Sequence, residues 1–191
     1  MENIEKIKED LKQILSEKRY IHSIGAMEKA IELAKRYGED EEESALTALT
    51  HDIAKEMKVE EYYKYAKENN IELSKDDKMC TSVLHGIIGA DIVKKKYGFT
   101  DEMCRAIHYH TTGITNMTLL GKIVYVADKI ENSRNYPEAE VLREKFNQCE
   151  SLDEFILYDI DYYTLPKMIE KKKVIHTNTI NVRNEIIEKM K

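Results

Sequence analysis

The sequence has few residues that break helices: only two prolines and seven glycines occur among its 191 residues. It also lacks sustained alternation of apolar and polar residues, which would be typical of strands. Apolar residues recur instead at intervals of three and four, as on one face of a helix. The pattern therefore predicts an all-α fold and argues against a βαβ architecture.

Cysteine is scarce as well. Cys80, Cys104 and Cys149 are widely spaced and odd in number, and none belongs to a CxxC pair of the kind used in zinc sites or thioredoxin-like chemistry. We expect free thiols in a reducing cytosol. The N-terminus lacks the apolar stretch of a signal peptide, and no apolar run approaches the length of a membrane span, so we expect a cytoplasmic protein.

Basic residues are outnumbered by acidic ones, 30 to 36, which gives a net charge of -6. No general attraction to nucleic acid or to an anionic membrane surface is expected, so a phosphate-bearing ligand would need local cations or a metal. The chain is 42% hydrophobic and 35% charged, and it has no repeat, low-complexity tract or flexible linker. These properties predict one compact helical domain over residues 1–191.

Capping residues predict where most helices begin and end. One apolar stripe covers Ile4 to Ile14, a second helix ends at Gly38, and a third begins at Asp40 and ends near Lys55-Glu56. A short helix is predicted to begin at Ser74 and end near His85, and the next to end at Gly98. Two more are predicted from Thr100 towards His110 and from Leu119 to near Asp128. The last two are predicted to begin at Ser151, with an interruption or kink at Pro166, and at Thr177. Residues 132–137 are predicted to form a loop, and the course of residues 131–150 is left open.

Side chains able to bind a divalent metal follow one another through the middle of the chain. They are His22, the pair His51-Asp52, His85, His110 and Asp128. Imidazole and carboxylate suit iron, manganese, zinc or cobalt, and an ion with open coordination positions can activate water. The alternative for each histidine is a solvated or structurally satisfied residue. An apolar run precedes both His51 and Asp128, so burial there would be costly unless a metal or hydrogen bonds compensated.

Helix geometry separates His108 from His110, because residues two apart on a helix point in directions that differ by about 200°. We choose His110, which adjoins the polar turn Thr111-Thr112-Gly113, and expect His108 to be solvated. His85 precedes Gly86 at the start of an apolar helix, where unpaired N–H groups suit an anion. The alternative is that Gly86 and Gly89 serve helix packing.

Cationic residues near these positions are candidates for phosphate binding. Lys55 lies three residues after Asp52, which indicates either a surface ion pair or an ammonium beside a metal-bound carboxylate. Arg134 is either solvated or a guanidinium that matches phosphate oxygens. The segment 174–177 follows three lysines and either closes over a base or belongs to a solvated face.

Six short motifs accompany this order of residues. They are RYIHS from Arg19, HDIAK from His51, LHG from Leu84, YHTTG from Tyr109, KIVYVAD from Lys122 and IH from Ile175. Together they resemble the HD-domain metal-dependent phosphohydrolases, and within that family the YqeK-type branch of bacterial symmetrical diadenosine tetraphosphate hydrolases. The resemblance extends from about Ile4 to Arg183 and implies a helical HD-domain bundle.

The resemblance implies roles for individual residues. His22, His51, Asp52 and Asp128 would hold a divalent metal, with iron expected and manganese or cobalt as alternatives. Asp52, His85 and His110 would act in catalysis, the two histidines facing the phosphates or a second metal. Substrate contacts are expected from His22, Lys55, His85, His110, Thr111, Thr112, Asp128, Arg134, Ile175, His176 and Thr177.

The resulting hypothesis is a hydrolase that uses metal-activated water to split diadenosine tetraphosphate into two ADP. One alternative is another HD-type activity, on a nucleoside monophosphate, a deoxynucleoside triphosphate or a cyclic dinucleotide. A second is a non-catalytic helical module that binds a nucleotide or a metal. We expect the protein to bind a nucleotide and to have neither nucleic acid nor a membrane as a partner. Whether it forms a homodimer is left open.

Overall fold

The structure, a computed structural model, describes residues 4–191. These residues form helices and no strands, as predicted, and none of the helices has the length and apolar character needed to cross a membrane. The elements in chain order are α1 (Ile4–Ile14), α2 (Glu17–Tyr37), α3 (Glu41–Thr50), α4 (Val59–Glu68), α5 (Lys75–Met79), the 3₁₀-helix η1 (Thr81–Val83), α6 (Leu84–Tyr97), α7 (Asp101–Tyr109), α8 (Leu119–Ile130), α9 (Pro137–Gln148), α10 (Leu152–Tyr158), the π-helix η2 (Asp159–Thr164), α11 (Leu165–Glu170) and α12 (Thr177–Lys189).

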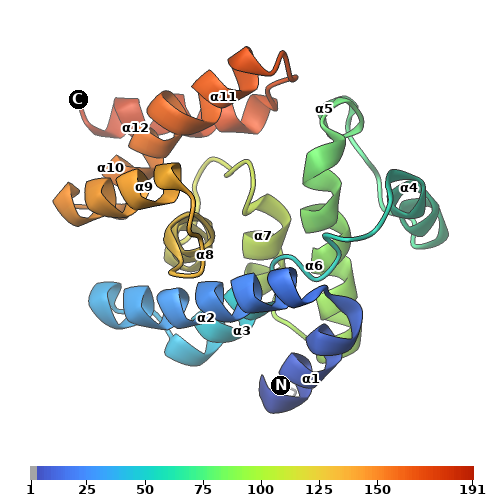
Figure 1. Cartoon of the computed structure of the whole chain (residues 1–191). Helices are drawn as coiled ribbons and strands as arrows, with labels where there is room; N and C mark the ends of the chain where they lie inside the picture. The colour runs from blue at the N-terminus through green and yellow to red at the C-terminus, as the bar shows by residue number, and fades with distance from the viewer. Residues whose placement is uncertain (1–3) are drawn as a thin grey trace.

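Helix α8 is the centre of the bundle. Its residues from Leu120 to Ala127 are buried except for Lys122. Helices α2, α3, α7, α9 and α10 all pack against it, and Figure 1 shows α8 nearly end-on, with α2 and α3 on one side and α9 and α10 on the other. A helix this apolar is stable only when other helices cover it. Residues near its C-terminal end, including Asp128, therefore lie within the bundle.

The predicted caps are confirmed at several helix ends. The side chain of Asp40 accepts a hydrogen bond from the backbone N–H of Glu43, and that of Thr100 accepts one from Met103. These bonds satisfy donors that have no partner within the helix. Gly38 and Gly98 follow α2 and α6 with left-handed backbone conformations, at φ values of 80° and 69°.

The prediction that the third helix continues to Lys55-Glu56 is wrong. Helix α3 ends at Thr50, and residues 51–56 form successive tight turns, with hydrogen bonds from Ile53 N–H to Thr50 O and from Lys55 N–H to Asp52 O. The apolar residues that suggested a longer helix are buried by tertiary packing instead. His51 and Asp52 therefore lie in the first of these turns, directly after the end of α3, and His51 still has a helical backbone conformation.

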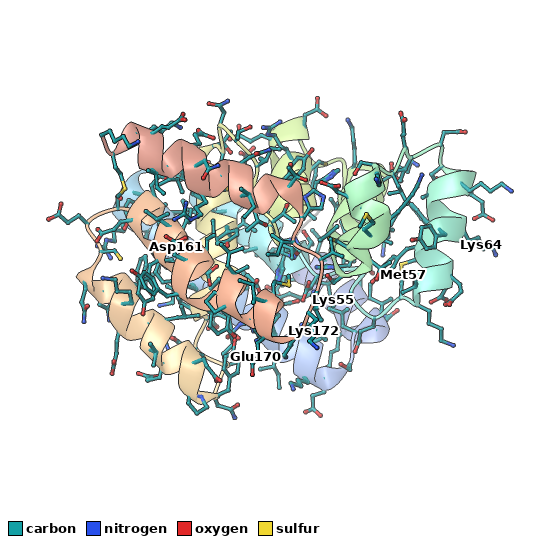
Figure 2. All side chains as sticks on the ribbon, turned by 90° about the horizontal axis from the view of Figure 1, so that it is seen from above. Lys55, Met57, Lys64, Asp161, Glu170 and Lys172 are labelled. Carbon is teal, nitrogen blue, oxygen red and sulfur yellow. The ribbon has the colours of Figure 1, made fainter. Side chains whose placement is uncertain are left out.

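Helix α4 and helix α9 were not predicted. In Figure 1 α4 lies at the edge of the molecule, and Figure 2 labels its Lys64 there, whereas Lys55 is labelled nearer the middle. The Tyr62 hydroxyl on α4 donates to the carbonyl of Ala54 and so ties α4 to the turns after α3. Helix α9 begins at Pro137, where the fixed φ of proline suits a first helical turn.

Two further boundaries differ from the prediction. Ser74 does form a capping box with Asp77, but α5 ends at Met79, and His85 belongs to the first turn of α6. At the predicted interruption near Pro166, the π-helix η2 joins α10 to α11. Its first residue, Asp159, is fully buried and accepts a hydrogen bond of 2.7 Å from the hydroxyl of Tyr125 on α8. This bond holds the C-terminal helices against the central one.

A glycine to alanine exchange tests the close packing of α6 on α7. A Cβ at Gly86 would lie 2.8 Å from the carbonyl oxygen of His108 and 3.0 Å from that of Ile107. We expect Gly86→Ala to lower the free energy of unfolding by about 1–3 kcal/mol, measured by thermal denaturation, because the backbone must move. In the control Gly121→Ala, the nearest neighbour of the new Cβ is a methionine side-chain carbon at 3.4 Å, so stability should be unchanged or higher. Equal losses in both variants would contradict the packing argument.

Candidate metal centre

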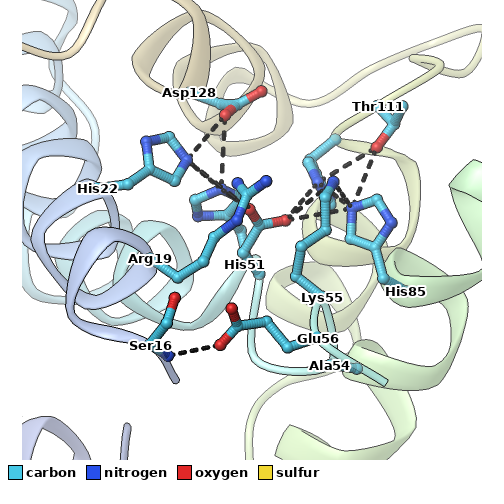
Figure 3. A network of polar contacts seen from close by, with 12 residues as sticks. Ser16, Arg19, His22, His51, Ala54, Lys55, Glu56, His85, Thr111 and Asp128 are labelled. Carbon is cyan, nitrogen blue, oxygen red and sulfur yellow. Dashed lines mark hydrogen bonds and ion pairs between the residues drawn. The ribbon is translucent and has the colours of Figure 1, made fainter. Parts of the chain in front are cut away.

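Four imidazole rings from four segments form a row inside the bundle, and Figure 3 labels three of them, His22, His51 and His85. The ring centroids of His22 and His51 lie 5.1 Å apart, those of His51 and His110 5.0 Å, and those of His110 and His85 4.8 Å. All four side chains are buried. Helix α2 supplies the first, the turn after α3 the second, the end of α7 the third and the start of α6 the fourth. The structure thus brings together the histidines that the sequence singled out.

The Nδ1 atom of each ring contacts an oxygen, and the Nε2 atoms face one another in two pairs, His22 with His51 and His85 with His110. A peptide carbonyl can only accept, so the ring nitrogen bonded to it must donate, which leaves a lone pair on the other nitrogen. The two pairs of Nε2 atoms are 3.2 Å and 3.0 Å apart. The rings of His51, His85 and His110, whose partners are peptide carbonyls, therefore each present an Nε2 lone pair, and such lone pairs suit a cation between or beside them. The Nδ1 contacts are His51 to Ala48 O at 2.6 Å, His85 to Ser82 O and His110 to Ile107 O at 2.7 Å each, and His22 to Glu131 Oε1 at 3.0 Å.

Asp52 lies between the two halves of the row. Its Oδ2 is 3.7 Å from Nε2 of His51 and 3.8 Å from Nε2 of His22. Its Oδ1 is 3.2 Å from Nε2 of His85 and 3.6 Å from Nε2 of His110. This oxygen is buried and accepts no hydrogen bond. A buried carboxylate oxygen beside ring lone pairs fits a positive charge, and Asp52 belongs to two groups of metal-binding atoms, one with each histidine pair.

Asp128 completes the group around His22 and His51. Its Oδ1 is 3.1 Å from Nε2 of His22 and 3.5 Å from Nε2 of His51, and it accepts a hydrogen bond of 2.6 Å from Arg134. Burial raises the pKa of Asp128, but the guanidinium of Arg134 and the bond to His22 outweigh burial and hold it well below its usual value. The Asp128 carboxylate is therefore charged and available as a fourth ligand.

Glu131 is a member of the site that the sequence analysis missed. It is fully buried, contacts Nδ1 of His22, and accepts hydrogen bonds from the backbone N–H and the hydroxyl of Ser133. Burial would lower the pKa of His22, but Asp128 and Glu131 raise it to about 9. A Cβ on Gly25 would lie only 2.2 Å from Oε2 of Glu131, so the glycine admits this carboxylate. Glu131 thus orients the His22 ring.

Two cations, Arg19 and Lys55, contact Asp52, and Figure 3 shows both of them beside the histidines. The guanidinium of Arg19 donates to Oδ2 at 2.9 Å, and the Lys55 ammonium lies 3.4 Å from Oδ1 and 2.9 Å from Nε2 of His85. Burial lowers the pKa of Lys55, partly offset by Asp52. The predicted Asp52–Lys55 pair is confirmed, whereas Arg19 was noted only within a motif. Both cations are partly exposed and can meet an anion from outside.

His108 lies outside the row of four rings. It stacks on Tyr109 with ring centroids 4.1 Å apart and is half-buried, so the expectation that it is solvated is wrong. Burial lowers the pKa of His108 to about 4, which keeps the ring neutral. Helix geometry did separate it from His110 as expected, because His110 alone of the two contacts Asp52.

The remaining predicted substrate residues belong to two segments, the turn after α7 and residues 175–177, which contact α5. Thr111 Oγ1 is 3.2 Å from Nε2 of His110, whereas the hydroxyl of Thr112 bonds to the carbonyl of Gly113. Nε2 of His176 is 3.1 Å from Oδ1 of Asp77, and Nδ1 of the same ring accepts a hydrogen bond from the backbone N–H of Asn178. Thr177 bonds to Asp76, and Ile175 lines a small cavity with both threonines of the turn. The segment is fastened to α5.

Two cavities lie beside the imidazole row. The first, here the His22 cavity, has a volume of about 570 Å³. The second, here the lysine cavity, has a volume of about 350 Å³. Arg134 and Tyr136 line both. The His22 cavity is also lined by Lys18, Arg19, Ile21 and His22, and the lysine cavity by Thr111, Lys129, Lys167 and Lys171.

Comparison with known proteins identifies the class to which this fold and site belong. A family model described as HD domain matches residues 19–133, a range that contains all six metal-binding candidates of the middle of the chain and also Glu131. The chain belongs to the HD domain family.

Relatives that match over nearly the whole chain point to one group within this family. The chain is 35% identical over 184 residues to the symmetrical bis(5'-nucleosyl)-tetraphosphatase of Halalkalibacterium halodurans, with 95% of each chain covered. It is 36% identical to the protein of that name from Staphylococcus aureus, covering 95% of this chain and 93% of the other. The crystal structure of a predicted HD superfamily hydrolase involved in NAD metabolism from Clostridium acetobutylicum superposes with a TM-score of 0.92 at 37% identity, covering 99% of each chain.

Removing Glu131 tests how the ring of His22 is positioned. We expect Glu131→Ala to weaken the binding of a divalent metal by about 10- to 100-fold, because His22 loses the partner that fixes its orientation. Equilibrium dialysis followed by elemental analysis measures the affinity. Glu131→Gln retains an acceptor and should lose less, and His108→Ala should bind metal as the wild type does. Unchanged affinity in Glu131→Ala would contradict the proposed orienting role.

Proposed function

We propose that this protein is a metal-dependent hydrolase that cleaves diadenosine tetraphosphate symmetrically into two ADP. The main support is the shared carboxylate of Asp52, which lies within reach of two histidine pairs and beside Lys55 and Arg19. Such a cluster combines metal ligands with cations for phosphate. The names of relatives that match nearly the full chain support the substrate and the symmetry of the cut.

The ligands of the metal follow from the donor atoms. His22, His51, Asp52 and Asp128 would hold the ion through two Nε2 atoms and two carboxylates. A bound ion lowers the pKa of a coordinated water towards neutrality and neutralises phosphate charge. Nitrogen and oxygen donors of this kind suit iron, which we propose as the native metal, with manganese or cobalt as functional substitutes. His85 and His110 would bind phosphoryl oxygens or a second ion.

The cations of the site would hold the polyphosphate in place. Lys55 and Arg19 point from the turns and from α2 towards Asp52, and Arg134 is fixed by Asp128 and by the hydroxyl of Tyr136. A guanidinium that is held at two points keeps its remaining donors in a defined direction. Thr111 extends the same surface into the lysine cavity, where four lysines would attract one ADP half of the substrate. These local charges offset the net charge of -6.

The reaction is a hydrolysis of a phosphoanhydride. The oxygen of water forms a bond to one of the two inner phosphorus atoms, and the bond from that phosphorus to the central bridging oxygen breaks. The bridging oxygen leaves with the electron pair as the terminal oxygen of one ADP, and the proton lost by water is released. Asp52 is a candidate acceptor for that proton because its Oδ1 faces the site without a hydrogen bond.

We further propose that residues 1–191 form one domain that acts in the cytoplasm on a nucleotide, without nucleic acid or membrane as partner. The excess of acidic residues supports this view, since it gives no general attraction to polyanions. A homodimer stays a hypothesis.

The direct test is incubation with diadenosine tetraphosphate under anaerobic conditions. We expect two ADP per substrate, resolved by chromatography, with iron(II), manganese or cobalt. His51→Ala and Asp52→Ala should lose both bound metal and at least about 100-fold in turnover, since each removes a ligand. ATP plus AMP as products would overturn the symmetric cut. Absence of turnover with every metal would favour a binding module.

A second test concerns the segment 174–177. We propose that His176 acts mainly by fastening this segment through Asp77, and that the lysines preceding it thereby face the lysine cavity. Asp77→Ala should raise KM for diadenosine tetraphosphate about tenfold with little change in kcat, because the hydrogen bond that holds the segment is lost away from the reacting bond. The control Glu68→Ala removes an exposed ion pair with Lys64 on α4 and should leave both constants unchanged. A fall in kcat alone would instead indicate that His176 acts at the reacting phosphate.

A further inference from the structure

The proposed function assigns no role to the larger of the two cavities, the His22 cavity. We propose that it holds the second nucleoside of the substrate, so that the dinucleotide lies across the imidazole row with one nucleoside at each end. This inference rests on the proposed function, because it assigns a second half-site for the same substrate.

The positions of the two cavities support the assignment. The His22 cavity is lined by the first ring of the row, and the lysine cavity by Thr111, whose hydroxyl is 3.2 Å from the third ring, His110, and 3.5 Å from the last, His85. In Figure 3 His22 and Thr111 accordingly lie on opposite sides of the cluster. Arg134 and Tyr136 line both cavities, so the two spaces meet at these side chains.

The lining of the His22 cavity suits a nucleoside with an attached phosphate. Ile21 on α2 is 48% exposed and lines the cavity, and the ring of Tyr136 gives a second apolar surface, as stacking of a base requires. Lys18 and Arg19 supply positive charge towards the cluster, and Asn135 supplies an amide. The volume of about 570 Å³ lies within the range of small-molecule sites.

Charge within the cavity is compatible with this ligand. Two acidic residues, Glu17 and Glu131, also line it. Glu131 is buried and already paired with His22 and Ser133, so it presents little free negative charge to a ligand. Three basic residues, Lys18, Arg19 and Arg134, face the same space.

The two half-sites would explain why the cut is symmetric. With one nucleoside in each cavity, the four phosphates lie along the row between them, and the middle of the chain lies at Asp52, which both histidine pairs share. Water attacks an inner phosphorus there, the bond to the central bridging oxygen breaks, and each cavity retains one ADP. A site with a single nucleoside pocket would not by itself centre the phosphate chain.

The test places a charge in the His22 cavity without altering the cluster. Ile21→Glu removes apolar surface and adds negative charge at a half-exposed position, so kcat/KM for diadenosine tetraphosphate should fall at least about tenfold. Val141→Glu makes the same exchange on α9, where the valine is 52% exposed and lines neither cavity, and it should leave kcat/KM unchanged. Equal kcat/KM in Ile21→Glu and wild type would overturn the proposal.

A binding measurement separates this proposal from the proposed function. Calorimetric titration of the manganese-loaded protein with ADP should give two ADP per chain for wild type and for Val141→Glu, and one for Ile21→Glu. One ADP per chain in wild type, or two in Ile21→Glu, would overturn the second half-site. If wild type does not cleave diadenosine tetraphosphate but binds two ADP, the proposed reaction fails while the second nucleotide site is supported.

Discussion

The structure depends on a negative charge buried where it would ordinarily be costly. Asp52 is 2% exposed, and its carboxylate is stabilised by Arg19, Lys55 and the surrounding imidazoles. These partners come from segments that are far apart in the sequence, so the charge can be accommodated only when α2, α6 and the ends of α3 and α7 have assembled. Folding and formation of the site are therefore one process, and the interior of the bundle is polar at the place where chemistry would occur.

The apolar core provides the rigidity that this polar centre requires. Helix α8 is buried along most of its length and ends at Asp128, so the position of that carboxylate is set by close packing rather than by a flexible loop. Glycine at position 86 brings α6 close to α7, and their histidines consequently meet at 3.0 Å. The backbone carbonyls one turn before three of the rings then fix the orientation of those rings.

Much of this arrangement could be predicted from the sequence, and the failures have identifiable causes. The histidine series, Asp52 and Asp128 stood out because metal-binding side chains interrupted apolar runs, and caps such as Asp40 mark local events. In the sequence Glu131 could not be distinguished from a surface acid after a helix. Its burial depends on the space left by Gly25, more than 100 positions earlier. The end of α3 was misplaced because Ile53 and Ala54 continue the helical periodicity while being buried by α4 and its neighbours. Whether the chain forms one domain stays a prediction.

The close approach of Gly25 to Glu131 has an evolutionary consequence. Any side chain at position 25 would displace the carboxylate at position 131, so the effect of a substitution at one position depends on the residue at the other. A lineage that lost Glu131 would be released from the need for glycine at 25, whereas in a lineage that keeps it even alanine would require the carboxylate to move. The two sites are thus epistatic, and among homologues they are expected to change together or remain fixed together.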